Sequence, residues 1–522
     1  MSEVSEDEIV PSAVPAPGTR RGDLRLSPLV LRPFVFLTGA AVMAVEFSAQ
    51  RLLQPFFGNS ELVWATLIGL ILLALSAGYA IGGRLADRWP DPRGLGLLSL
   101  GAGLFVAVLP TMASPFLGAV LKGLLNTPSG VVISSILATA LLFTPPVAAL
   151  GAISPYAVRL VIDESATAGK KTGSLYSWST FGSIVGTFVP AFVSIPDLGV
   201  RATLWIAAGV LIAIGALMLA RIGLVALIIL PLVLSQTAPT LLKPVGGLIA
   251  EVETPYQFAQ VYRLGNGDIA LSVNDSAGIQ SIYTKSTLTG LYYDAYLVLP
   301  FMFPSHQPMS ALLIGVAAGT IPTMYLRDVD PYRARVSMTG VEIDPTLIQL
   351  GHRYFHLTSA AAKVKISDGR VYLATSKRRY DLVIVDAYSQ EIYIPFSLTT
   401  KEFFAQCRAH LTAGGILAMN VNVTSDRSAL LLAVERTLLL SFRYVYVAKA
   451  PGEYNELVVA SNRPVSLPPL PSLPSFLGPV RNLLAATWAK PKVEPGLILT
   501  DNRAPVEAMT NAMILKKLGG AL

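Results

Sequence analysis

Three carboxylates in the second half of the sequence each follow a short apolar segment. Glu342 ends VSMTGVE, Asp368 follows VKIS, and Asp386 follows DLVIV. Where strands alternate with helices, the strands form a parallel sheet, and ligands bind beyond their carboxyl ends. Glu342 comes 27 residues after Gly315, near the spacing of a nucleoside-binding unit, so we expect it to bind a ribose diol. We expect Asp368 to accept a hydrogen bond from an adenine amine, and Asp386 to face the reacting atoms.

Each of these acids also has a purely structural alternative. A carboxylate at the end of a strand can cap the next helix or close a turn, and Asp368, which precedes Gly369, suits that role equally well. The segment GVAAG, which begins at Gly315, is not a complete GxGxxG pattern. We therefore do not predict a pyrophosphate cradle.

No metal and no bound cofactor are expected. His352 and His356 are four residues apart, a spacing that can hold a metal on a helix, but no third ligand accompanies them. A solvated helix face is the simpler interpretation. Cys407 is the single cysteine, which excludes an intramolecular disulfide framework, a cysteine-rich zinc module and an iron–sulfur cluster. We expect Cys407 to be a small buried core residue.

The elements that must position these residues follow two patterns. Residues 257–283 alternate in short strands around Asn266-Gly267, which is a hairpin signal. A helix is expected next, over 288–300. From residue 311 onward strands alternate with helices, which predicts a parallel sheet covered on both faces. The expected strands are 311–315, 336–343, 364–367, 381–388 and 415–421, with two more near 443–449 and 456–461, and the expected helices are 345–355, 370–377, 399–411 and 426–440.

Charged residues are distributed unevenly along the chain. They make up 14% overall, but only 17 of the 204 residues from 33 to 236, against 47 of the 286 residues from 237 onward. The first region is typical of a membrane domain, and we expect six or seven spans, since a helical span needs about 20 apolar residues. Pro145 and Pro146 should kink the fourth span. The apolar runs are 33–53, 62–83, 95–115, 130–152, 174–195, 202–220 and 222–236.

Basic residues fall in alternate connections of this region. They are Arg20, Arg21, Arg25, Arg32, Arg84, Arg88, Arg93, Arg159, Lys170 and Lys171. The positive-inside rule then places the N-terminus in the cytoplasm, and seven spans would leave the second half outside. Nucleoside substrates are cytosolic, however, and this consideration receives more weight. We expect an integral protein of a bacterial inner membrane with a cytoplasmic catalytic half, which requires that one run does not fully cross. The net charge of +7 is spread along the chain without an aromatic-rich basic block, so no nucleic-acid partner is expected.

With these residues in view, the segment from 255 to 510 resembles the spermidine synthase (aminopropyltransferase) family. The matching motifs are PYQ (255–257), GIQS (278–281), LLIGVAAGT (312–320), VEID (341–344), SDG (367–369), YDLVIVDAYS (380–389), PFSLTTKEFF (395–404) and LTDNRAPVE (499–507). The whole chain is similar to the spermidine-synthase-like integral membrane proteins, in which such a domain follows a multi-span region.

The resemblance implies the fold class and the domain plan. The fold is a multi-span α-helical membrane domain followed by an α/β Rossmann-like domain with a small N-terminal β-sheet. The expected domains are a flexible tail (1–32), a transmembrane helical domain (33–236), a small β-sheet subdomain with a connecting helix (237–310) and a Rossmann-like nucleoside-binding catalytic domain (311–522).

The resemblance also implies roles for individual residues. Members of the family bind decarboxylated S-adenosylmethionine and transfer its aminopropyl arm to an amine, releasing 5′-methylthioadenosine. Glu342 would then hold the ribose and Asp368 the adenine, with Gln257 and Gln280 near the nucleoside. Asp386 would take a proton from the attacking amine and is the expected catalytic residue. The expected substrate-binding residues are Gln257, Gln280, Tyr292, Tyr293, Asp294, Gly315, Glu342, Asp368, Tyr388 and Ser389.

The sequence departs from the family's pattern at acidic positions. Ala318 aligns with the Asp of the family's glycine-rich loop, and Ser389 aligns with a second Asp in the loop after the fourth strand. Tyr292-Tyr293-Asp294 stands where the family has Tyr-His-Glu. A desolvated polyamine needs several carboxylates, so these departures weaken the polyamine site while leaving the adenosyl site mostly intact.

These departures favour a lyase acting on S-adenosylmethionine. Its own carboxylate would displace 5′-methylthioadenosine and form homoserine lactone, since intramolecular attack gains a large effective molarity. The first alternative is a polyamine aminopropyltransferase whose acceptor is held by Asp294, Glu391 or a group on the membrane side. Further alternatives are a methyltransferase that uses S-adenosylmethionine and a non-catalytic nucleoside-sensing membrane protein. The expected partners are an adenosyl sulfonium substrate and the lipid bilayer, and a homo-oligomer is compatible with the sequence.

Overall fold

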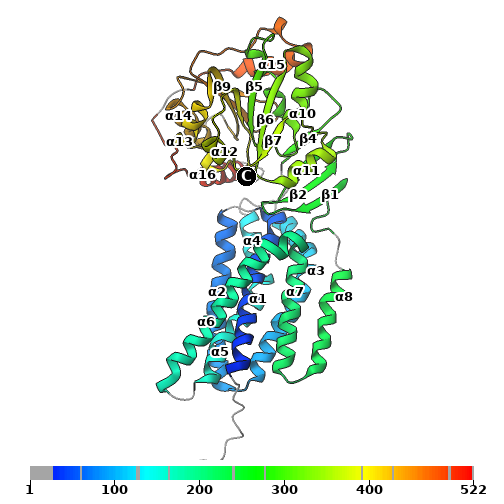
Figure 1. Ribbon diagram of the computed structural model, residues 1–522, viewed down its shortest axis with the longest axis vertical. Coiled ribbons are helices and arrows are strands. Elements are labelled where there is room, and N and C mark those ends of the chain that lie inside the picture. Colours follow the sequence, from blue (N-terminus) through cyan, green and yellow to red (C-terminus); the bar gives the residue numbers. More distant parts are fainter. Residues whose placement is uncertain are drawn as a thin grey trace, which may run out of the picture.

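Two bodies of different character make up the molecule in this computed structural model (Figure 1). A bundle of apolar helices forms one end, and an α/β body forms the other. This arrangement confirms the expected fold class. The structure describes residues 28–58, 61–124, 130–162, 165–237, 241–274, 278–389, 392–425, 428–491 and 495–519.

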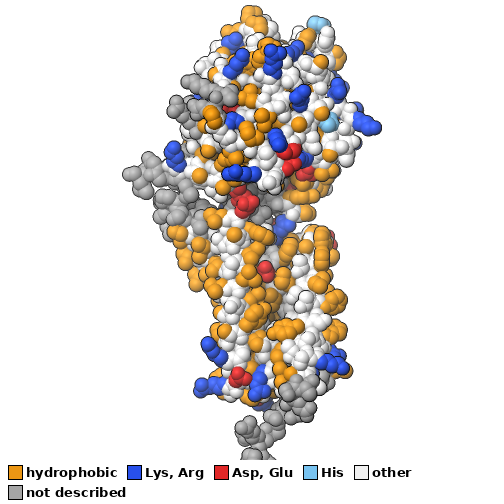
Figure 2. Space-filling view, turned by 90° about the vertical axis from the view of Figure 1, so that its left-hand side faces the viewer, with side chains coloured by type: hydrophobic (Ala, Val, Ile, Leu, Met, Phe, Trp, Pro, Cys, Tyr) orange, Lys and Arg blue, Asp and Glu red, His pale blue; other side chains and the backbone are white. Residues whose placement is uncertain are grey.

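The helical bundle contains every apolar run that the sequence indicated. Its elements are α1 (Pro28–Phe57), α2 (Glu61–Arg88), α3 (Arg93–Leu124), α4 (Gly130–Leu142), α5 (Thr144–Val161), α6 (Ser165–Val189), the π-helical turn η1 (Pro190–Ser194), α7 (Ile195–Met218), the 3₁₀ helix η2 (Ile222–Ile228) and α8 (Ile229–Thr237). Among the described residues, four helical runs are long and apolar enough to cross a membrane, or five if one bent pair counts as a span. Apolar side chains are spread along the face of the bundle that Figure 2 shows, as expected of a lipid-facing surface.

The bent pair confirms the expected kink. Ile133–Leu142 and Thr144–Val161 meet at an angle of 49°. Pro145 and Pro146 occupy the first turn of α5, where proline starts a helix but cannot continue the preceding one. The fourth span is therefore two helices joined at Phe143.

The longest apolar run, Thr167–Met218, contains two passes. It has 52 residues, and a single straight helix of that length would be about 78 Å long, more than twice the thickness of a bilayer's hydrocarbon core. The first part, α6, lies parallel to α1, because Gly182 packs against the backbone of Phe36 and Gly186 against that of Ala40.

The second part of this run, α7, returns in the opposite direction. Gly199 leaves helical geometry with φ of +85°, and the chain reverses there. Helix α7 lies antiparallel to α3, since Gly103 contacts Leu211 while Gly96 contacts Leu219. The remaining 16 residues, η2 and α8, extend farther than an α-helix of that length because a 3₁₀ turn rises about 2 Å per residue. The bundle thus passes seven times between its two ends.

An odd number of passes puts the start of α1 and the catalytic half at opposite ends of the bundle (Figure 1). The far end carries the basic residues Arg84, Arg88, Arg93, Arg159, Lys170, Lys171 and Arg221. Figure 2 shows Lys and Arg side chains gathered at that end. The start of α1 and the α/β body therefore lie on opposite sides of any membrane that the bundle spans, and they cannot both be cytoplasmic.

The catalytic half begins with a small antiparallel sheet of four strands in the order β1-β2-β3-β4. The strands are β1 (Leu248–Glu253), β2 (Phe258–Arg263), β3 (Ile269–Val273) and β4 (Ser281–Tyr283). The hairpin at Asn266-Gly267 is confirmed, with Gly267 at φ of +90°. Strand β1 was not predicted, because its polar and apolar residues do not alternate strictly.

A seven-stranded sheet follows, in the order β10-β11-β9-β8-β5-β6-β7. Its strands are β5 (Met309–Ile314), β6 (Val336–Glu342), β7 (Lys363–Ile366), β8 (Tyr380–Val385), β9 (Leu411–Asn422), β10 (Tyr444–Lys449) and β11 (Asn455–Ser461). Strands β7, β6, β5, β8 and β9 are parallel, whereas β11 is antiparallel to β9 and to β10. The sheet is therefore mixed rather than fully parallel, because β10 and β11 form a hairpin.

Helices cover both faces of this sheet (Figure 1). They are α10 (Thr320–Met324), α11 (Pro345–Tyr354), α12 (Gly369–Thr375), α13 (Lys401–Ala409), α14 (Ala429–Leu439), α15 (Gly478–Thr487) and α16 (Val506–Gly519). The helix expected over 288–300 is instead a short helix α9 (Tyr293–Tyr296) and a 3₁₀ turn (Leu299–Met302), since Pro300 interrupts the run.

Two smaller expectations have different outcomes. Cys407 is fully buried, which confirms its place in the core. His352 and His356 do not share a helix face, because α11 ends at Tyr354 and His356 has φ of +57°. Among the described residues, no group of three or more His, Cys, Asp or Glu side chains could hold a metal ion.

Candidate active site

A cavity of about 330 Å³ opens at the carboxyl ends of β5, β6, β7 and β8. Parallel strands place their following loops at one edge of the sheet, so residues far apart in the sequence converge there. Most of the residues that the sequence predicted for the site line this cavity. They are Gln257, Gln280, Gly315, Glu342, Asp368, Asp386, Tyr388 and Ser389.

Gly315 lets two neighbouring strand ends approach each other. Its φ is +88°, and a Cβ atom at this position would clash with the carbonyl oxygen of Asp386. The backbone N–H of Asp386 donates to the carbonyl oxygen of Ile314 at 2.9 Å. A side chain at position 315 would therefore push the Asp386 loop away from β5.

Glu342 braces the loop that follows β5. Its Oε2 accepts hydrogen bonds from the N–H groups of Val316 at 3.0 Å and Ala317 at 2.8 Å. Its Oε1 accepts from Ile343 at 2.9 Å and Asp344 at 3.0 Å. Burial raises the pKa of Glu342, and these backbone hydrogen bonds oppose the rise. Since a carboxylate has about four acceptor positions, binding a ribose diol would require some of these bonds to give way.

Asp368 caps helix α12 and also lines the cavity. Its Oδ1 accepts from the N–H groups of Arg370 at 2.8 Å and Val371 at 3.0 Å. Arg370 in turn forms an ion pair with Asp501, which lies in the predicted TDNRAPVE segment. Asp501 therefore joins the C-terminal segment to the wall of the cavity, and Asp368 fills both the capping role and the position that the adenine role requires.

Asp386 lies beside a group of tyrosines. The hydroxyl of Tyr292 donates to its Oδ2 at 3.2 Å, and that of Tyr296 donates to its Oδ1 at 3.4 Å. Burial raises the pKa of Asp386 to about 7, while the Tyr292 and Tyr296 hydroxyls and the nearby Asn420 amide oppose the rise. A general base works best when its pKa lies near the working pH, so Asp386 is suited to remove a proton at neutral pH.

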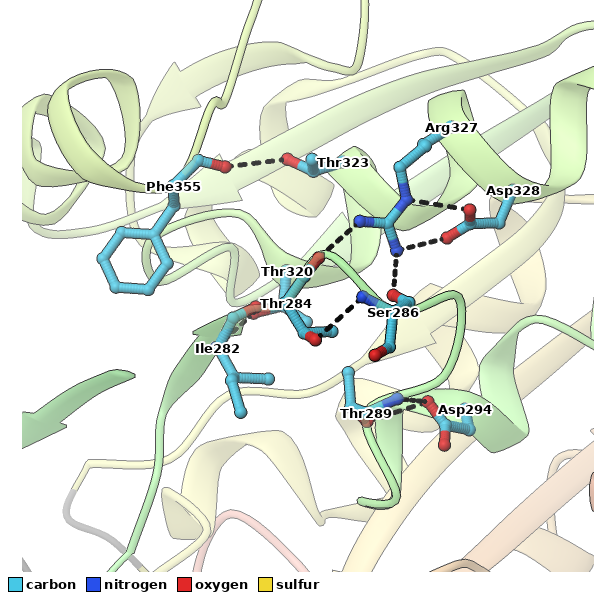
Figure 3. Close-up of polar contacts among 10 residues, drawn as sticks. All are labelled: Ile282, Thr284, Ser286, Thr289, Asp294, Thr320, Thr323, Arg327, Asp328 and Phe355. Carbon is cyan, nitrogen blue, oxygen red and sulfur yellow. Dashed lines mark hydrogen bonds and ion pairs between the residues drawn. The ribbon is translucent and has the colours of Figure 1, made fainter. Parts of the chain in front are cut away.

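Two predicted residues serve the framework around this group. The hydroxyl of Tyr293 donates to the carbonyl oxygen of Ile279 at 2.7 Å. Asp294 is turned toward its own loop: its Oδ1 accepts from the N–H and hydroxyl of Thr289, and its Oδ2 accepts from the N–H of Gly290 at 2.8 Å (Figure 3). Asp294 is buried and lines none of the cavities near Asp386. It is therefore not positioned to hold an amine.

Arg327 anchors the loop that precedes Asp294. Its guanidinium binds Asp328 and donates to the carbonyl oxygens of Thr284 and Ser286 (Figure 3). Thr320 lies below, where its hydroxyl bonds with both the N–H and the carbonyl of Ile282. These contacts hold the segment that leads to Tyr292 and Tyr296.

The two positions where the family has Asp do not have equivalent surroundings. Ala318 is fully buried in a core cluster with Leu347, Leu350 and Phe355, and it is Ala317 that lines the nucleoside cavity. Ser389 is exposed and lines the same cavity. The absence of acids at 318 and 389 therefore says little about an amine pocket, and this removes the main support for preferring a lyase.

A helix of the bundle contacts the turn that precedes Gln257. Arg51 in α1 donates to the carbonyl oxygens of Thr254 at 3.0 Å and Pro255 at 2.5 Å. The hydroxyl of Thr254 donates to Asp344 at 2.6 Å and accepts from the N–H of Gln257 at 2.9 Å. Arg51 thus supports the turn that presents Gln257 to the cavity.

A second cavity, of about 510 Å³, adjoins the first. Gln280 and Tyr388 line both cavities, and Tyr292, which bonds Asp386, lines the second. The other polar side chains of its wall include Asn420, Asn422 and Asn455. Sequence reasoning missed these asparagines and Tyr296. Asn420 lies at the end of the strand predicted over 415–421, and Asn422 ends the observed β9. Tyr296 stands one helical turn after Tyr292, so strand ends and i, i+4 spacing were the available signals.

The fold is an α/β domain with a cavity at the carboxyl ends of its parallel strands, which is where such sheets bind ligands. Comparison with known families is more specific, because residues 299–461 match the model of the spermine/spermidine synthase domain. This part of the chain is therefore similar to the spermine/spermidine synthase domain.

Curated relatives carry related names. Over 180 residues the chain is 40% identical to a probable polyamine aminopropyl transferase of Bifidobacterium longum, covering 34% of this chain and 38% of that protein. It is 31% identical over 183 residues to a polyamine aminopropyltransferase of Vibrio vulnificus, covering 34% of this chain and 55% of that protein. The chain thus spans between about two fifths and just over half of the length of these relatives.

Solved structures with related folds include a probable spermidine synthase from Corynebacterium glutamicum. Its TM-score is 0.38 at 18% sequence identity, with 49% of this chain and 99% of that chain covered. The spermidine synthase from Thermotoga maritima has a TM-score of 0.36 at 18% identity, with 47% of this chain and 84% of that chain covered.

Proposed function

We propose that this protein transfers the aminopropyl arm of decarboxylated S-adenosylmethionine to an amine at a membrane surface. The observation that carries the proposal is Asp386, a carboxylate with a raised pKa at the end of a central strand, between a nucleoside-sized cavity and a second cavity. The match to the spermine/spermidine synthase domain and the names of the curated relatives support it.

The reaction needs one nucleophilic displacement and one proton transfer. The lone pair of a neutral amine attacks the arm's carbon next to the sulfonium, and the carbon–sulfur bond breaks with its electron pair going to sulfur. Neutral 5′-methylthioadenosine leaves, and the new ammonium loses a proton to Asp386. Before the transfer, the Asp386 carboxylate also favours the sulfonium cation, which places one group in both roles.

This proposal replaces the lyase as the preferred interpretation. The lyase was favoured because two acidic positions of the family are Ala318 and Ser389, and neither of these side chains lines the second cavity. The curated relatives carry aminopropyltransferase names, and aminopropyl transfer uses the second cavity, for which a lyase has no need.

Product analysis tests the proposal. Purified full-length protein is given decarboxylated S-adenosylmethionine or S-adenosylmethionine, each with and without a primary amine. We expect 5′-methylthioadenosine and an aminopropylated amine only from the decarboxylated substrate with amine. Homoserine lactone from S-adenosylmethionine alone would support the lyase instead, and S-adenosylhomocysteine would support a methyltransferase.

The proposal also requires an orientation for the protein. Sulfonium nucleosides are cytosolic, so we propose that the catalytic half faces the cytoplasm of a bacterial inner membrane. The basic far end of the bundle would then face outward, against the positive-inside rule. The orientation is therefore an independent test of the proposed reaction, because a catalytic half outside the cell would not meet its nucleoside.

A further inference from the structure

The second cavity, next to Asp386, has an unusual lining for a polyamine site. Among the described residues that line it, none is charged. A compact dication or trication loses much hydration when it enters a protein, and carboxylates must compensate for that loss. Here the polar lining consists of amide and hydroxyl groups, so the described wall offers no partner for a second positive charge.

The asparagines of this cavity form a connected group. The Nδ2 of Asn455 donates to Oδ1 of Asn420 at 3.1 Å and to Oδ1 of Asn422 at 2.6 Å. The Nδ2 of Asn420 is buried close enough to Asp386 to favour its ionised form, yet it makes no hydrogen bond of normal geometry among the described residues. An unsatisfied buried donor costs free energy, so this amide gains when the ionised Asp386 or a bound ligand offers it an acceptor.

Apolar side chains complete the wall on the side nearest the bundle. Met513 and Ile514 come from α16, which lies at the end of the catalytic half that faces the membrane helices (Figure 1). Oε1 of Glu507 in α16 accepts from the N–H of Glu61, the first residue of α2, at 2.5 Å. The helix that lines the cavity therefore also contacts the end of a membrane helix.

We infer that the acceptor is an amphiphilic primary amine with one charged group, whose apolar tail lies along α16 toward the bilayer surface. This inference rests on the proposed function and specifies its substrate class. The head group enters past Tyr292 and Asn420 and reaches Asp386 as a neutral amine, and the apolar part is buried against Met513 and Ile514. A membrane-resident acceptor also gives a reason for joining this domain to a helical bundle.

A matched pair of amines tests the inference. Octylamine and 1,8-diaminooctane have the same chain length and differ in the second ammonium group. Full-length protein in lipid nanodiscs is given decarboxylated S-adenosylmethionine with each amine, with putrescine, or with propylamine, and release of 5′-methylthioadenosine is measured. We expect the catalytic efficiency with octylamine to exceed that with the eight-carbon diamine, putrescine or propylamine by at least about tenfold, because each methylene gains from burial and the second charge is not matched.

A charge variant reverses the preference. Asn422→Asp keeps the oxygen that accepts from Asn455 and adds a negative charge to the cavity, so it should raise the efficiency with the eight-carbon diamine, relative to octylamine, by about tenfold. Asn462→Asp, outside the cavity, should leave the ratio unchanged. Faster turnover of the diamine or of putrescine by the wild-type protein would overturn the inference while the proposed function stands. No turnover with any amine would remove the proposed function itself.

Discussion

The protonation of Asp386 should control the rate of the proposed reaction at neutral pH. Burial raises its pKa to about 7, against an ordinary value of 3.8. Only the ionised carboxylate accepts a proton, so at saturating amine kcat/KM for the nucleoside should increase with pH and level off above about pH 8. At pH 6, one unit below the pKa, about a tenth of the sites are ionised, and kcat/KM should be about tenfold below its plateau.

Tyr296→Phe should move this inflection upward. The hydroxyl of Tyr296 donates to Asp386 at 3.4 Å and favours the ionised form. Without it the pKa of Asp386 should rise by about half a unit to one unit, since hydrogen bonds to charged groups contribute about 1.5 kcal/mol or more when well formed and this one is long. Activity at pH 7 should fall, while the plateau at high pH should be largely retained.

The assay is the pH dependence of kcat/KM and of kcat from release of 5′-methylthioadenosine. Bound sulfonium cation favours the carboxylate, so the inflection in kcat should lie below that in kcat/KM. Tyr372→Phe is the control, because the hydroxyl of Tyr372 pairs with that of Tyr380. An inflection that stays at the same pH in the wild-type protein and in Tyr296→Phe, or an activity that falls as pH rises from 6 to 8, would refute the role of Asp386 as base.

Three further predictions concern the rest of the molecule. Arg51→Ala should raise KM for the nucleoside about tenfold with kcat within about twofold, because two hydrogen bonds to the turn that presents Gln257 are lost. Arg51→Lys should restore KM in part and Lys170→Ala should have no effect; an unchanged KM would contradict this. Gly315→Ala should lower the Tm and nearly abolish turnover, since the strained φ costs about 1–3 kcal/mol and the new Cβ meets the backbone of Asp386; wild-type activity would exclude the steric argument. The native Cys407 is buried, so a cysteine introduced at Lys377 or Lys170 should be the site that a thiol reagent labels in intact cells or inverted vesicles. If the catalytic half is cytoplasmic, Lys377→Cys should be labelled only in inverted vesicles, and its labelling in intact cells would contradict that orientation.

The strand ends could be predicted from the sequence because they depend on local patterns. Glu342, Asp368 and Asp386 each follow an apolar run, and parallel topology then brings them to one edge of the sheet. The spans followed from hydropathy for the same reason, including the bend at Pro145. The hydrogen-bond partners of these residues could not be predicted, since two of the four backbone donors around Glu342 depend on how the loop after β5 folds back over β6.

The remaining features depend on contacts between distant segments. Arg51 reaches Thr254 across 203 positions of sequence, and no local pattern marks that pair. Asp294 was expected to bind the amine acceptor because it aligns with a family motif. Its carboxylate instead accepts a hydrogen bond from the N–H of Thr289 and so points toward the preceding loop. Ala318 marked a missing acid in the alignment, yet its side chain points into the core.

The central claim is that a three-carbon arm moves from sulfonium to amine at Asp386. Decarboxylated S-adenosylmethionine carrying a deuterium label on its aminopropyl arm, incubated with the full-length protein and octylamine, tests it by mass spectrometry of the amine product. The account predicts that the labelled arm appears on the amine in a one-to-one ratio with 5′-methylthioadenosine, and that Asp386→Asn lowers this yield by at least about a hundredfold. Formation of 5′-methylthioadenosine without label on the amine would contradict it.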